Sequence, residues 1–390
     1  MTADELLAAE VTHTELADVQ YTHADGDINL TWGHPDPSKF ALEAIGDATA
    51  SVLISHGWQT LAYGAAHGAG YTRDAIAEHL TTTDVPVDAE EVIVTAGSSG
   101  GLDLLLTMLA VPGDVVVVEQ PTYFLALRMF ADHGLRIVGV ASDEHGPDPD
   151  AVADAAASAG ARGTRVFLYL VPTFANPTGR CMSTERQLTL LEIARSHRVL
   201  VIDDDVYRDT SPTAPPSMWS LDRDTVMRLG SFSKSLSPGL RVGYLTAGAE
   251  IIDRIGGCGL LDSGGGVNHF ASMVVAEMMH SGSFREIATA GQARYAERRA
   301  ALAAALDPAL FTFTAPDGGY FLWLQLPDGV SSSRAVAAAH DLAVDVSDGC
   351  KFFVDAADSE FVRVSFSMLS TDLLREGAAR LNEAVRSLVS

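Results

Sequence analysis

Basic residues are scarce in this 390-residue chain, which has 26 Lys and Arg residues against 51 Asp and Glu residues and a net charge of −25. Such a field repels phosphate backbones and anionic lipid surfaces, which argues against nucleic-acid and membrane partners. No apolar run reaches the ~18 residues of a membrane span. The N-terminal twenty residues are acidic and lack the basic flank and apolar core of a signal peptide. We therefore expect a cytoplasmic protein.

Cysteine is also rare. Cys181, Cys258 and Cys350 are widely spaced, form no CxxC pair and have no clustered His partners. This pattern excludes a disulfide framework and predicts no metal site. By contrast, 47% of the residues are hydrophobic, which is enough for a compact globular protein. A chain of this length is expected to form two large lobes.

Short β-rich runs alternate with amphipathic stretches from about residue 90 onward. The runs are continuously apolar, as expected for strands of a parallel sheet that is covered on both faces. They are EVIVT (91–95), DVVVVE (114–119), RIVGV (136–140), RVFLYL (165–170), VLVID (199–203), TVMRLG (225–230) and RVGYLTA (241–247). The alternation predicts an α/β fold with a mostly parallel sheet.

Around residue 266 the pattern changes to long helical stretches with two β-rich runs, GGYFLWLQL (318–326) and FVRVSFSML (361–369). This predicts a smaller α+β unit. The N-terminal forty residues contain no strand–helix repeat and are its expected complement. We predict a large domain at 41–283 and a small domain formed by 1–40 and 284–390.

The segment SFSKSLSPGLRVGY (231–244) contains the most informative motif. Lys234 follows a predicted strand among small residues, and Arg241 comes seven positions later. A desolvated lysine can attack a carbonyl carbon, and an arginine can hold a phosphate with two hydrogen bonds. This pair favours a Schiff base and a phosphate clamp on one loop.

Other polar residues follow neighbouring predicted strands. Asp204 and Tyr207 lie in VIDDDVYRD (201–209), and Asn176 lies in an Asn-Pro-Thr-Gly turn. Ser98 and Ser99 stand at a predicted helix start, which is suited to an anion because its first N–H groups are unpaired. A metal site at the acidic cluster would need further oxygen or His ligands, and none is evident.

Together with Tyr123 in EQPTYF (119–124), these residues resemble the fold type I pyridoxal-phosphate enzymes of the class I/II aminotransferase family. The similarity is greatest to 2-aminoadipate and kynurenine aminotransferases and the related regulator domains, and it extends from about residue 28 to the end. It implies a large mostly parallel α/β/α domain with a smaller α+β domain. It also implies pyridoxal 5'-phosphate as cofactor and a homodimer with shared active sites.

The resemblance implies roles for the matched residues. Lys234 resembles the Schiff-base lysine, Asp204 the partner of the pyridine nitrogen, and Tyr123 the residue stacked on the ring; these are the implied catalytic residues. Arg363 resembles the arginine that holds the substrate α-carboxylate. The remaining implied contacts are Tyr207 and Asn176 to the ring hydroxyl oxygen, Ser98, Ser99, Ser231, Ser233 and Arg241 to the phosphate, Tyr63 to the partner subunit's phosphate, and Asn176 and Gly33 to the substrate.

The chain also departs from the family pattern. Ser99-Gly100 and Ala175 stand where the family usually has Gln, and Asp348-Gly349 replaces a Pro-Gly pair. Most unusual is LDSGGGVNHF (261–270), in which Gly264, Gly265 and Gly266 precede Asn268 and His269. Glycines remove side-chain volume. We therefore expect these glycines and His269, with His34 opposite, to border a roomier substrate mouth, where His34 reads the substrate or acts as a second acid or base.

The favoured function is an aminotransferase that acts on an α-amino acid through Schiff-base exchange at Lys234 and a quinonoid carbanion. The alternative is β/γ elimination, replacement or cyclisation on the same scaffold, suggested by the altered mouth. A third hypothesis, a pyridoxal-phosphate-binding regulator, requires an attached DNA-binding domain. The roughly thirty residues before the recognisable region are too few for one, and the negative charge does not suit DNA.

Overall fold

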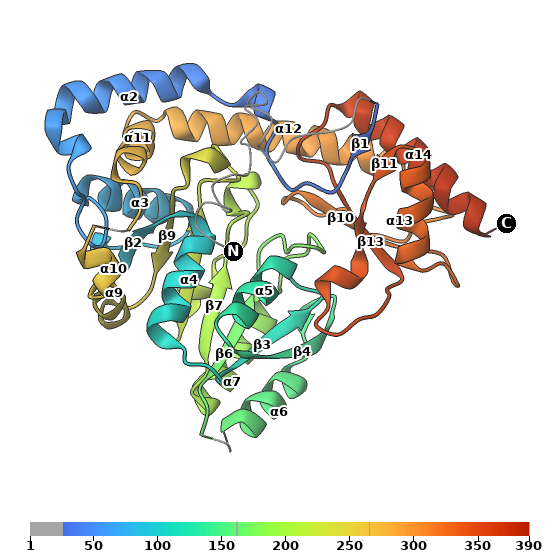
Figure 1. Cartoon of the computed structure of the whole chain (residues 1–390), viewed down its shortest axis with the longest axis horizontal. Helices are drawn as coiled ribbons and strands as arrows, with labels where there is room; N and C mark the ends of the chain where they lie inside the picture. Colours follow the sequence, from blue (N-terminus) through green and yellow to red (C-terminus); the bar gives the residue numbers. More distant parts are fainter. Residues whose placement is uncertain (1–25, 161–162, 265, 390) are drawn as a thin grey trace, which may run out of the picture.

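The computed structural model describes residues 26–160, 163–264 and 266–389 (Figure 1). Within these residues the largest sheet has eight strands in the order β2-β9-β8-β7-β6-β3-β4-β5. Their bounds are β2 (Val92–Thr95), β9 (Gly243–Thr246), β8 (Val226–Ser231), β7 (Leu200–Asp204), β6 (Val166–Leu170), β3 (Val115–Gln120), β4 (Arg136–Asp143) and β5 (Gly146–Pro147).

Strands β4, β3, β6, β7 and β8 run parallel to one another, whereas β9 is antiparallel to both β8 and β2, and β5 is antiparallel to β4. Each of the seven β-rich runs between residues 91 and 247 overlaps one of these strands. The prediction of a mostly parallel sheet is therefore confirmed.

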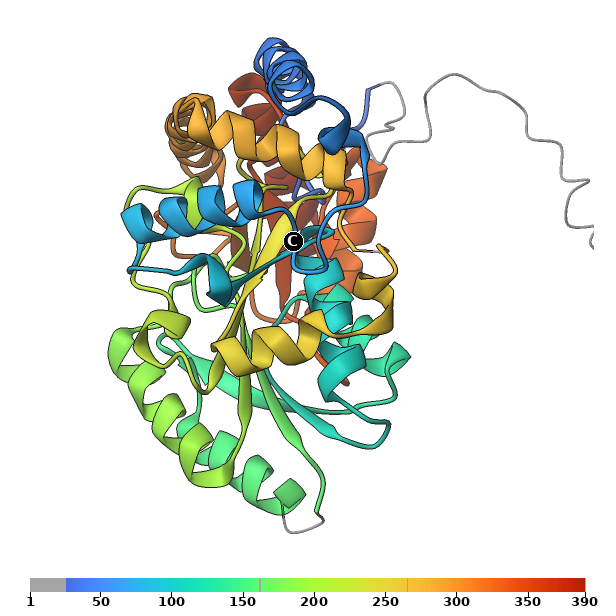
Figure 2. The same cartoon turned by 90° about the vertical axis from the view of Figure 1, so that its left-hand side faces the viewer.

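Alternating side chains of the central strands fill two cores, one on each face of the sheet. In β3, Val115 and Val117 point to one core, and Val116 and Val118 point to the other. Helices cover both faces (Figure 2). The first core contains residues of α2 (Leu42–His56), α3 (Gly70–Thr83), α6 (Pro149–Gly160), α7 (Thr184–His197) and α11 (His269–His280). The second contains residues of α4 (Gly97–Leu109), α5 (Phe124–Asp132), α9 (Ala249–Gly256) and α10 (Gly259–Asp262).

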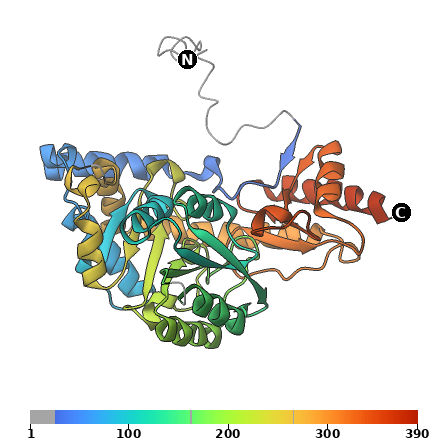
Figure 3. The same ribbon diagram turned by 60° about the horizontal axis from the view of Figure 1, so that its bottom comes forward.

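The C-terminal elements form a second lobe with its own apolar core (Figure 3). Strand β1 (Ile28–Asn29) reaches this lobe and pairs with β11 (Val344–Asp345), so the N-terminal segment packs with the C-terminal residues. The other elements of the lobe are β10 (Phe321–Gln325), β12 (Ser347–Asp348), β13 (Phe361–Ser365), α13 (Ser332–Asp341) and α14 (Thr371–Val389).

Helix α12 (Ser283–Ala305) connects the two lobes. Phe284 near its start belongs to the first core of the large sheet, whereas Leu302 near its end belongs to the C-terminal core. A boundary at residue 284 would therefore fall at the start of a helix that both cores share. The division into 41–283 and 1–40 plus 284–390 stays a prediction, and residues 1–25 lie outside the described residues.

This topology gathers loops at one edge of the sheet. Because β6, β7 and β8 are parallel, the segments that follow Leu170, Asp204 and Ser231 leave the sheet at the same edge. In open α/β sheets, ligands bind at the carboxyl ends of the strands. The predicted site residues on these loops are therefore brought close together.

Candidate active site

A cavity of about 530 Å³ lies at this edge of the sheet, between the large sheet and the C-terminal lobe. Its lining includes four cationic side chains, Lys234, Arg241, Lys351 and Arg363, and one carboxylate, Asp204. In a chain with a net charge of −25, such a concentration of positive charge is suited to anionic groups. The predicted site residues in its lining are Gly33, His34, Ser98, Ser99, Tyr123, Asn176, Asp204, Tyr207, Ser231, Ser233, Lys234, Arg241 and Arg363.

The amine of Lys234 is held between the two lobes. Its Nζ donates a hydrogen bond of 2.6 Å to the backbone oxygen of Gly33. Burial lowers the pKa of Lys234 to about 8, and the nearby cations Arg363 and Arg241 contribute to this decrease. Gly33 itself lies against an aromatic ring, because a Cβ atom there would come within 2.4 Å of Phe321 Cζ. The Lys234 amine is therefore available as a nucleophile near neutral pH.

Asp204, the last residue of β7, is 6% exposed. Its Oδ2 accepts a hydrogen bond of 2.5 Å from the hydroxyl of Tyr169. Its Oδ1 is buried and has no hydrogen-bond partner among the described residues. A buried carboxylate oxygen without a partner is costly, and a protonated ring nitrogen would satisfy it. The carboxylate therefore fits the pyridine nitrogen of pyridoxal phosphate.

The amide of Asn176 is oriented by the C-terminal lobe. Arg363 Nη1 donates a hydrogen bond of 2.7 Å to Asn176 Oδ1. Asn176 also hydrogen-bonds the side chain of Tyr207, whose pKa burial raises well above its usual value. Both side chains are nearly buried, at 5% and 3% exposed, and line the cavity. They are suited to donate to an oxygen on a planar ring. Tyr123, the residue immediately before α5, lines the same cavity.

The first turn of α4 forms an anion site with the loop after β8. Ser98 and Ser99 line the cavity from this turn, where backbone N–H groups are unpaired. Gly97, which has a φ of +76°, lies against the guanidinium group of Arg241. A Cβ atom at this position would come within 2.5 Å of Arg241 Nη2. Arg241 Nη1 is 3.4 Å from Ser233 Oγ. This arrangement fits a phosphate group.

Arg363 on β13 is 4% exposed and closes the cavity from the C-terminal lobe. Its Nη2 donates hydrogen bonds to Thr31 O at 2.6 Å and Ser347 Oγ at 3.1 Å. Its guanidinium carbon lies 4.0 Å from the ring centroid of Phe321. The Nε atom is buried and has no partner among the described residues. This unsatisfied donor beside Lys234 is suited to a carboxylate ligand.

His34 lines the cavity, where its ring stacks on Trp32 with centroids 5.3 Å apart. Burial, with a smaller effect of the Lys234 charge, lowers the pKa of His34 to about 4. The imidazole is therefore neutral at pH 7. This argues against His34 as an acid near neutral pH, and both its predicted roles, substrate contact and second acid or base, stay predictions.

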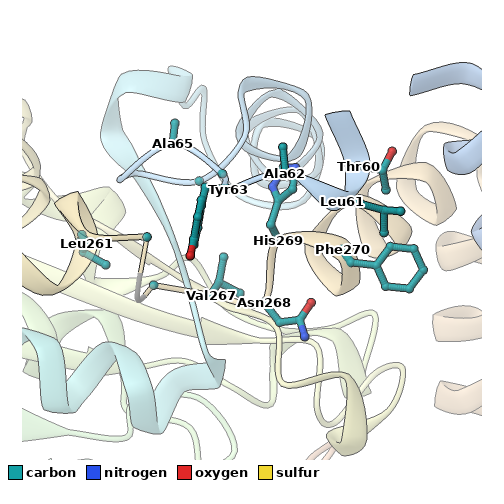
Figure 4. A pocket seen from close by; sticks show the side chains of 14 residues that line it. Thr60, Leu61, Ala62, Tyr63, Ala65, Leu261, Val267, Asn268, His269 and Phe270 are labelled. Atoms are coloured by element: carbon teal, nitrogen blue, oxygen red, sulfur yellow. The ribbon is translucent and has the colours of Figure 1, made fainter. Parts of the chain in front are cut away.

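Tyr63 and His269 do not line the Lys234 cavity in the subunit described here. They line a second cavity of about 820 Å³ together with Gly264 and Gly266 (Figure 4). The Tyr63 ring packs on Gly264, where a Cβ atom would lie 2.5 Å from Tyr63 Cδ1. His269 is the first residue of α11, which Asn268 caps by accepting a hydrogen bond from Ala271 N.

The expected position of His269 opposite His34 is therefore not seen within one subunit. The physical reason is local, because His269 Nε2 lies 3.1 Å from the Gln59 backbone oxygen and is held against the segment that carries Tyr63. Gly265 lies outside the described residues.

Several residues of the site are not found by sequence reasoning. Tyr169 stands in the sequence only as part of a buried strand, yet it contacts Asp204 directly. Lys351, Trp32 and Ser347 line the cavity from the small lobe. The chemical signal for Tyr169 is a phenol hydroxyl in an otherwise apolar strand, but its role can be inferred only when β6 and β7 are known to be neighbours.

Among the described residues, no helix has the length and apolar character needed to cross a membrane. No group of three or more His, Cys, Asp or Glu side chains in the same residues is arranged to hold a metal ion.

Comparison with known proteins relates this geometry to a family. The family model described as aminotransferase class I and II matches residues 25–381. The 2-aminoadipate transaminase of Thermus thermophilus is 31% identical over 95% of this chain and 93% of its own length. Aromatic-amino-acid aminotransferase 1 of Thermococcus litoralis is 30% identical over 92% of this chain and 88% of its own length.

A solved structure is similar as well. It is the α-aminoadipate aminotransferase of Thermus thermophilus, complexed with N-(5'-phosphopyridoxyl)-L-leucine. The two structures superpose with a TM-score of 0.83 at 31% sequence identity, covering 94% of this chain and 93% of the other.

Proposed function

The chain belongs to the class I and II aminotransferase family, and from this premise we propose that the cavity around Lys234 is the site of amino-group transfer from an α-amino acid to a 2-oxo acid. The matches confirm the predicted fold type I architecture, the aminotransferase activity and pyridoxal phosphate as cofactor. The observation that carries the placement of the site is the convergence of Lys234, Asp204 and Arg363 on one cavity.

When bound, pyridoxal phosphate supplies an aldehyde carbon that accepts an amino group and a ring that withdraws electrons from the substrate Cα. We propose that Lys234 Nζ holds the aldehyde carbon in the resting enzyme. When free, the same amine would be the base that takes the proton from the substrate Cα. The lowered pKa of Lys234, about 8, supports this role because an appreciable fraction of the amine is neutral at pH 7.

The other residues position the two molecules. Asp204 Oδ1 is proposed to hold a proton on the ring nitrogen, and Arg363 to bind the substrate α-carboxylate. Tyr207 and Asn176 donate to the ring hydroxyl oxygen, and Tyr123 covers the ring. The proposed phosphate ligands are Ser98, Ser99, Ser231, Ser233 and Arg241, all of which line the cavity.

Single-turnover spectroscopy tests this function. The holoenzyme, mixed with an amino acid and no acceptor, is expected to convert its cofactor to pyridoxamine phosphate and release one equivalent of 2-oxo acid. The alternative of elimination, replacement or cyclisation predicts that the starting cofactor spectrum returns, with ammonia or a replaced side chain as product. Return of the starting spectrum across a broad panel of amino acids would contradict the proposal.

The substrate side chain is proposed to be aromatic or long and acidic. Trp32, Phe124 and Leu125 give the cavity an apolar wall, and Lys351 provides a cation at its edge. The names of the two relatives, an aromatic-amino-acid aminotransferase and a 2-aminoadipate transaminase, are consistent with this choice. Comparison of kcat/KM for phenylalanine, kynurenine, 2-aminoadipate, glutamate and alanine tests it, with alanine expected to be the poorest substrate.

We also propose that the functional unit is a homodimer. Large apolar side chains are exposed along α2 and the following turn η2 (Gly57–Leu61), among them Ile54 at 84% and Trp58 at 77%. Tyr63, just beyond this turn, is 87% exposed and lies outside the Lys234 cavity of its own subunit. Burial of this surface against a second copy would stabilise a dimer. It would also let Tyr63 reach the phosphate bound by the partner.

Mixing two variants tests whether Tyr63 acts across the dimer. Tyr63→Phe is expected to weaken pyridoxal phosphate binding roughly 10- to 100-fold, the effect of losing one hydrogen bond to a charged group. In a mixed dimer of Tyr63→Phe with Lys234→Ala, one site should regain both intact residues and bind cofactor normally. Tyr71→Phe is the control, since that hydroxyl bonds Glu277 within the subunit. An active monomer in ultracentrifugation, or no regained site, would contradict the proposal.

The cytoplasmic location predicted from the sequence stays a proposal. It is supported by the free state of Cys181, Cys258 and Cys350, as expected for a reducing compartment.

A further inference from the structure

Tyr169 on β6 is fully buried and contacts Asp204, which lines the Lys234 cavity. In the parallel pairing of β6 with β7, Tyr169 stands opposite Ile202, so Asp204 is two residues further along the same face. The Tyr169 hydroxyl donates to Asp204 Oδ2 at 2.5 Å. On its other side the Tyr169 ring meets Phe130 edge-on, with centroids 5.2 Å apart. The phenol is therefore fixed by packing and aimed at one oxygen of the carboxylate.

The two oxygens of Asp204 thus differ. Oδ2 is occupied by Tyr169, whereas Oδ1 is buried and has no partner among the described residues. A carboxylate that is free to rotate would offer either oxygen to the cofactor. The hydrogen bond removes this freedom and leaves Oδ1 as the acceptor. The hydrogen bond from Tyr169 therefore fixes the orientation of the Asp204 carboxylate before the cofactor binds.

The hydrogen bond from Tyr169 also affects the protonation state of Asp204, because the surroundings of this carboxylate disfavour its charged form. Burial, with a smaller effect of the neighbouring Asp205, raises the pKa of Asp204 to about 6, although the hydrogen bond from Tyr169 and the charge of Lys234 act in the opposite direction. Burial, followed by the neighbouring Asp204, Tyr123 and Glu119, raises the pKa of Tyr169 well above its usual value. Tyr169 therefore stays a neutral donor.

We infer that Tyr169 is a positioning residue for amino-group transfer, which keeps Asp204 ionised so that the proton between Asp204 and the cofactor stays on the ring nitrogen. This inference rests on the proposed function, in which Asp204 Oδ1 meets that nitrogen. A hydrogen-bond donor to a carboxylate stabilises its charged form and makes it a weaker base. Without that donor, the proton would move toward the carboxylate, and the ring would become a poorer electron acceptor.

The test uses holoenzymes reconstituted with pyridoxal phosphate that carries ¹⁵N in its ring, observed by ¹⁵N NMR. The wild type should give the signal of a protonated ring nitrogen. Tyr169→Phe keeps the volume of the buried side chain and should move the signal toward the unprotonated value. It should also lower kcat about 10- to 100-fold, the effect of losing a hydrogen bond to a charged group. KM should change much less, because Tyr169 is not expected to touch the substrate.

Phe130→Leu is the matched control, since it disturbs the packing of the Tyr169 ring without removing the hydroxyl. It should keep the wild-type ¹⁵N signal. An unchanged signal in Tyr169→Phe, or the same shift in Phe130→Leu, would overturn the inference. Should Tyr169→Phe not fold, a fluorotyrosine at position 169 replaces it. Its more acidic hydroxyl is a better donor and should retain the ring proton to higher pH than tyrosine does; no such retention would overturn the inference.

Asp204→Ala separates the inference from the proposal on which it depends. If Asp204→Ala leaves the ring nitrogen protonated as in the wild type, Asp204 does not contact the nitrogen and the proposed site is wrong. If Asp204→Ala removes the ring proton whereas Tyr169→Phe does not, the site stands and only the role of Tyr169 is wrong.

Discussion

Replacing Lys234 by alanine is expected to lower the rate of amino-group transfer on the order of 10⁵- to 10⁶-fold, the range found when the nucleophile of a covalent mechanism is removed. The variant should still fold, because Lys234 is only partly buried and its Nζ makes a single hydrogen bond, to the Gly33 backbone oxygen. The variant should also lack the covalent link between Lys234 Nζ and the cofactor's aldehyde carbon, which borohydride reduces in the wild type. Mass spectrometry of the reduced wild type should locate the cofactor on the peptide that contains Lys234.

The small number of lysines makes this experiment decisive. Besides Lys234, the sequence contains only Lys39 and Lys351. Lys39→Ala is the matched control, since Lys39 is exposed and does not line the cavity. It should retain full labelling and activity. Label on Lys39 or Lys351 in the wild type would refute the assignment.

The pKa of Lys234 also predicts how the rate of pyridoxal phosphate binding to the apoenzyme depends on pH. Only the neutral form of Lys234 attacks the aldehyde, and its pKa is lowered to about 8. At pH 7 about one-tenth of the amine would be neutral, compared with about 0.03% for an ordinary lysine. The rate of capture by apoenzyme should rise about tenfold between pH 6 and pH 7 and level off above about pH 8. A rate that still rises tenfold per unit between pH 9 and pH 10 would contradict the lowered pKa.

Removing Arg363 has the second-largest expected effect. Arg363→Ala should lower kcat/KM for α-amino acids by about 2–5 kcal/mol of transition-state stabilisation, which is roughly 30- to several thousand-fold. The loss arises because the substrate carboxylate would be left desolvated and unpaired. Removal of the guanidinium also frees Asn176 Oδ1 and Ser347 Oγ, so part of the loss reflects disorder of Asn176.

Arg363→Lys separates these contributions, since lysine restores the charge but not the planar pair of donors. It should recover only part of the lost kcat/KM. Amines without a carboxylate should be slowed much less by Arg363→Ala than amino acids are, because only the loss through Asn176 applies to them. If Arg363→Ala slows amines as much as it slows amino acids, or leaves amino acids unaffected, the α-carboxylate is bound elsewhere.

The main features of the fold could be predicted from the sequence because they depend on local patterns. A strand that is buried on both faces is a nearly continuous apolar run, as in the four valines of β3 and in β6, and this makes the parallel sheet recognisable. The residues after such strands leave the sheet at one edge, so Lys234, Asp204 and Asn176 could be grouped without coordinates. Arg241 was found in the same way, since it stands on the same loop as Lys234.

The expectations that stay predictions involve residues whose neighbours come from distant parts of the chain. His34 was expected to titrate near neutral pH, but its burial beside Lys234 lowers its pKa to about 4. His269 was placed at the substrate mouth because of the glycines before it. In the structure Gly264 allows the Tyr63 ring to approach, and His269 Nε2 lies 3.1 Å from the Gln59 backbone oxygen.

The sequence by itself determined the chemistry of this protein: the amine, the carboxylate, the phosphate ligands and the alternation that builds the sheet are all local features of the chain. Only the tertiary structure decided which of these groups control one another. The bond from Arg363 to Asn176 spans 187 residues, and the one from Tyr169 to Asp204 crosses between two strands. Burial and hydrogen bonding set the charge and orientation of these side chains, and both depend on packing partners that no local pattern specifies.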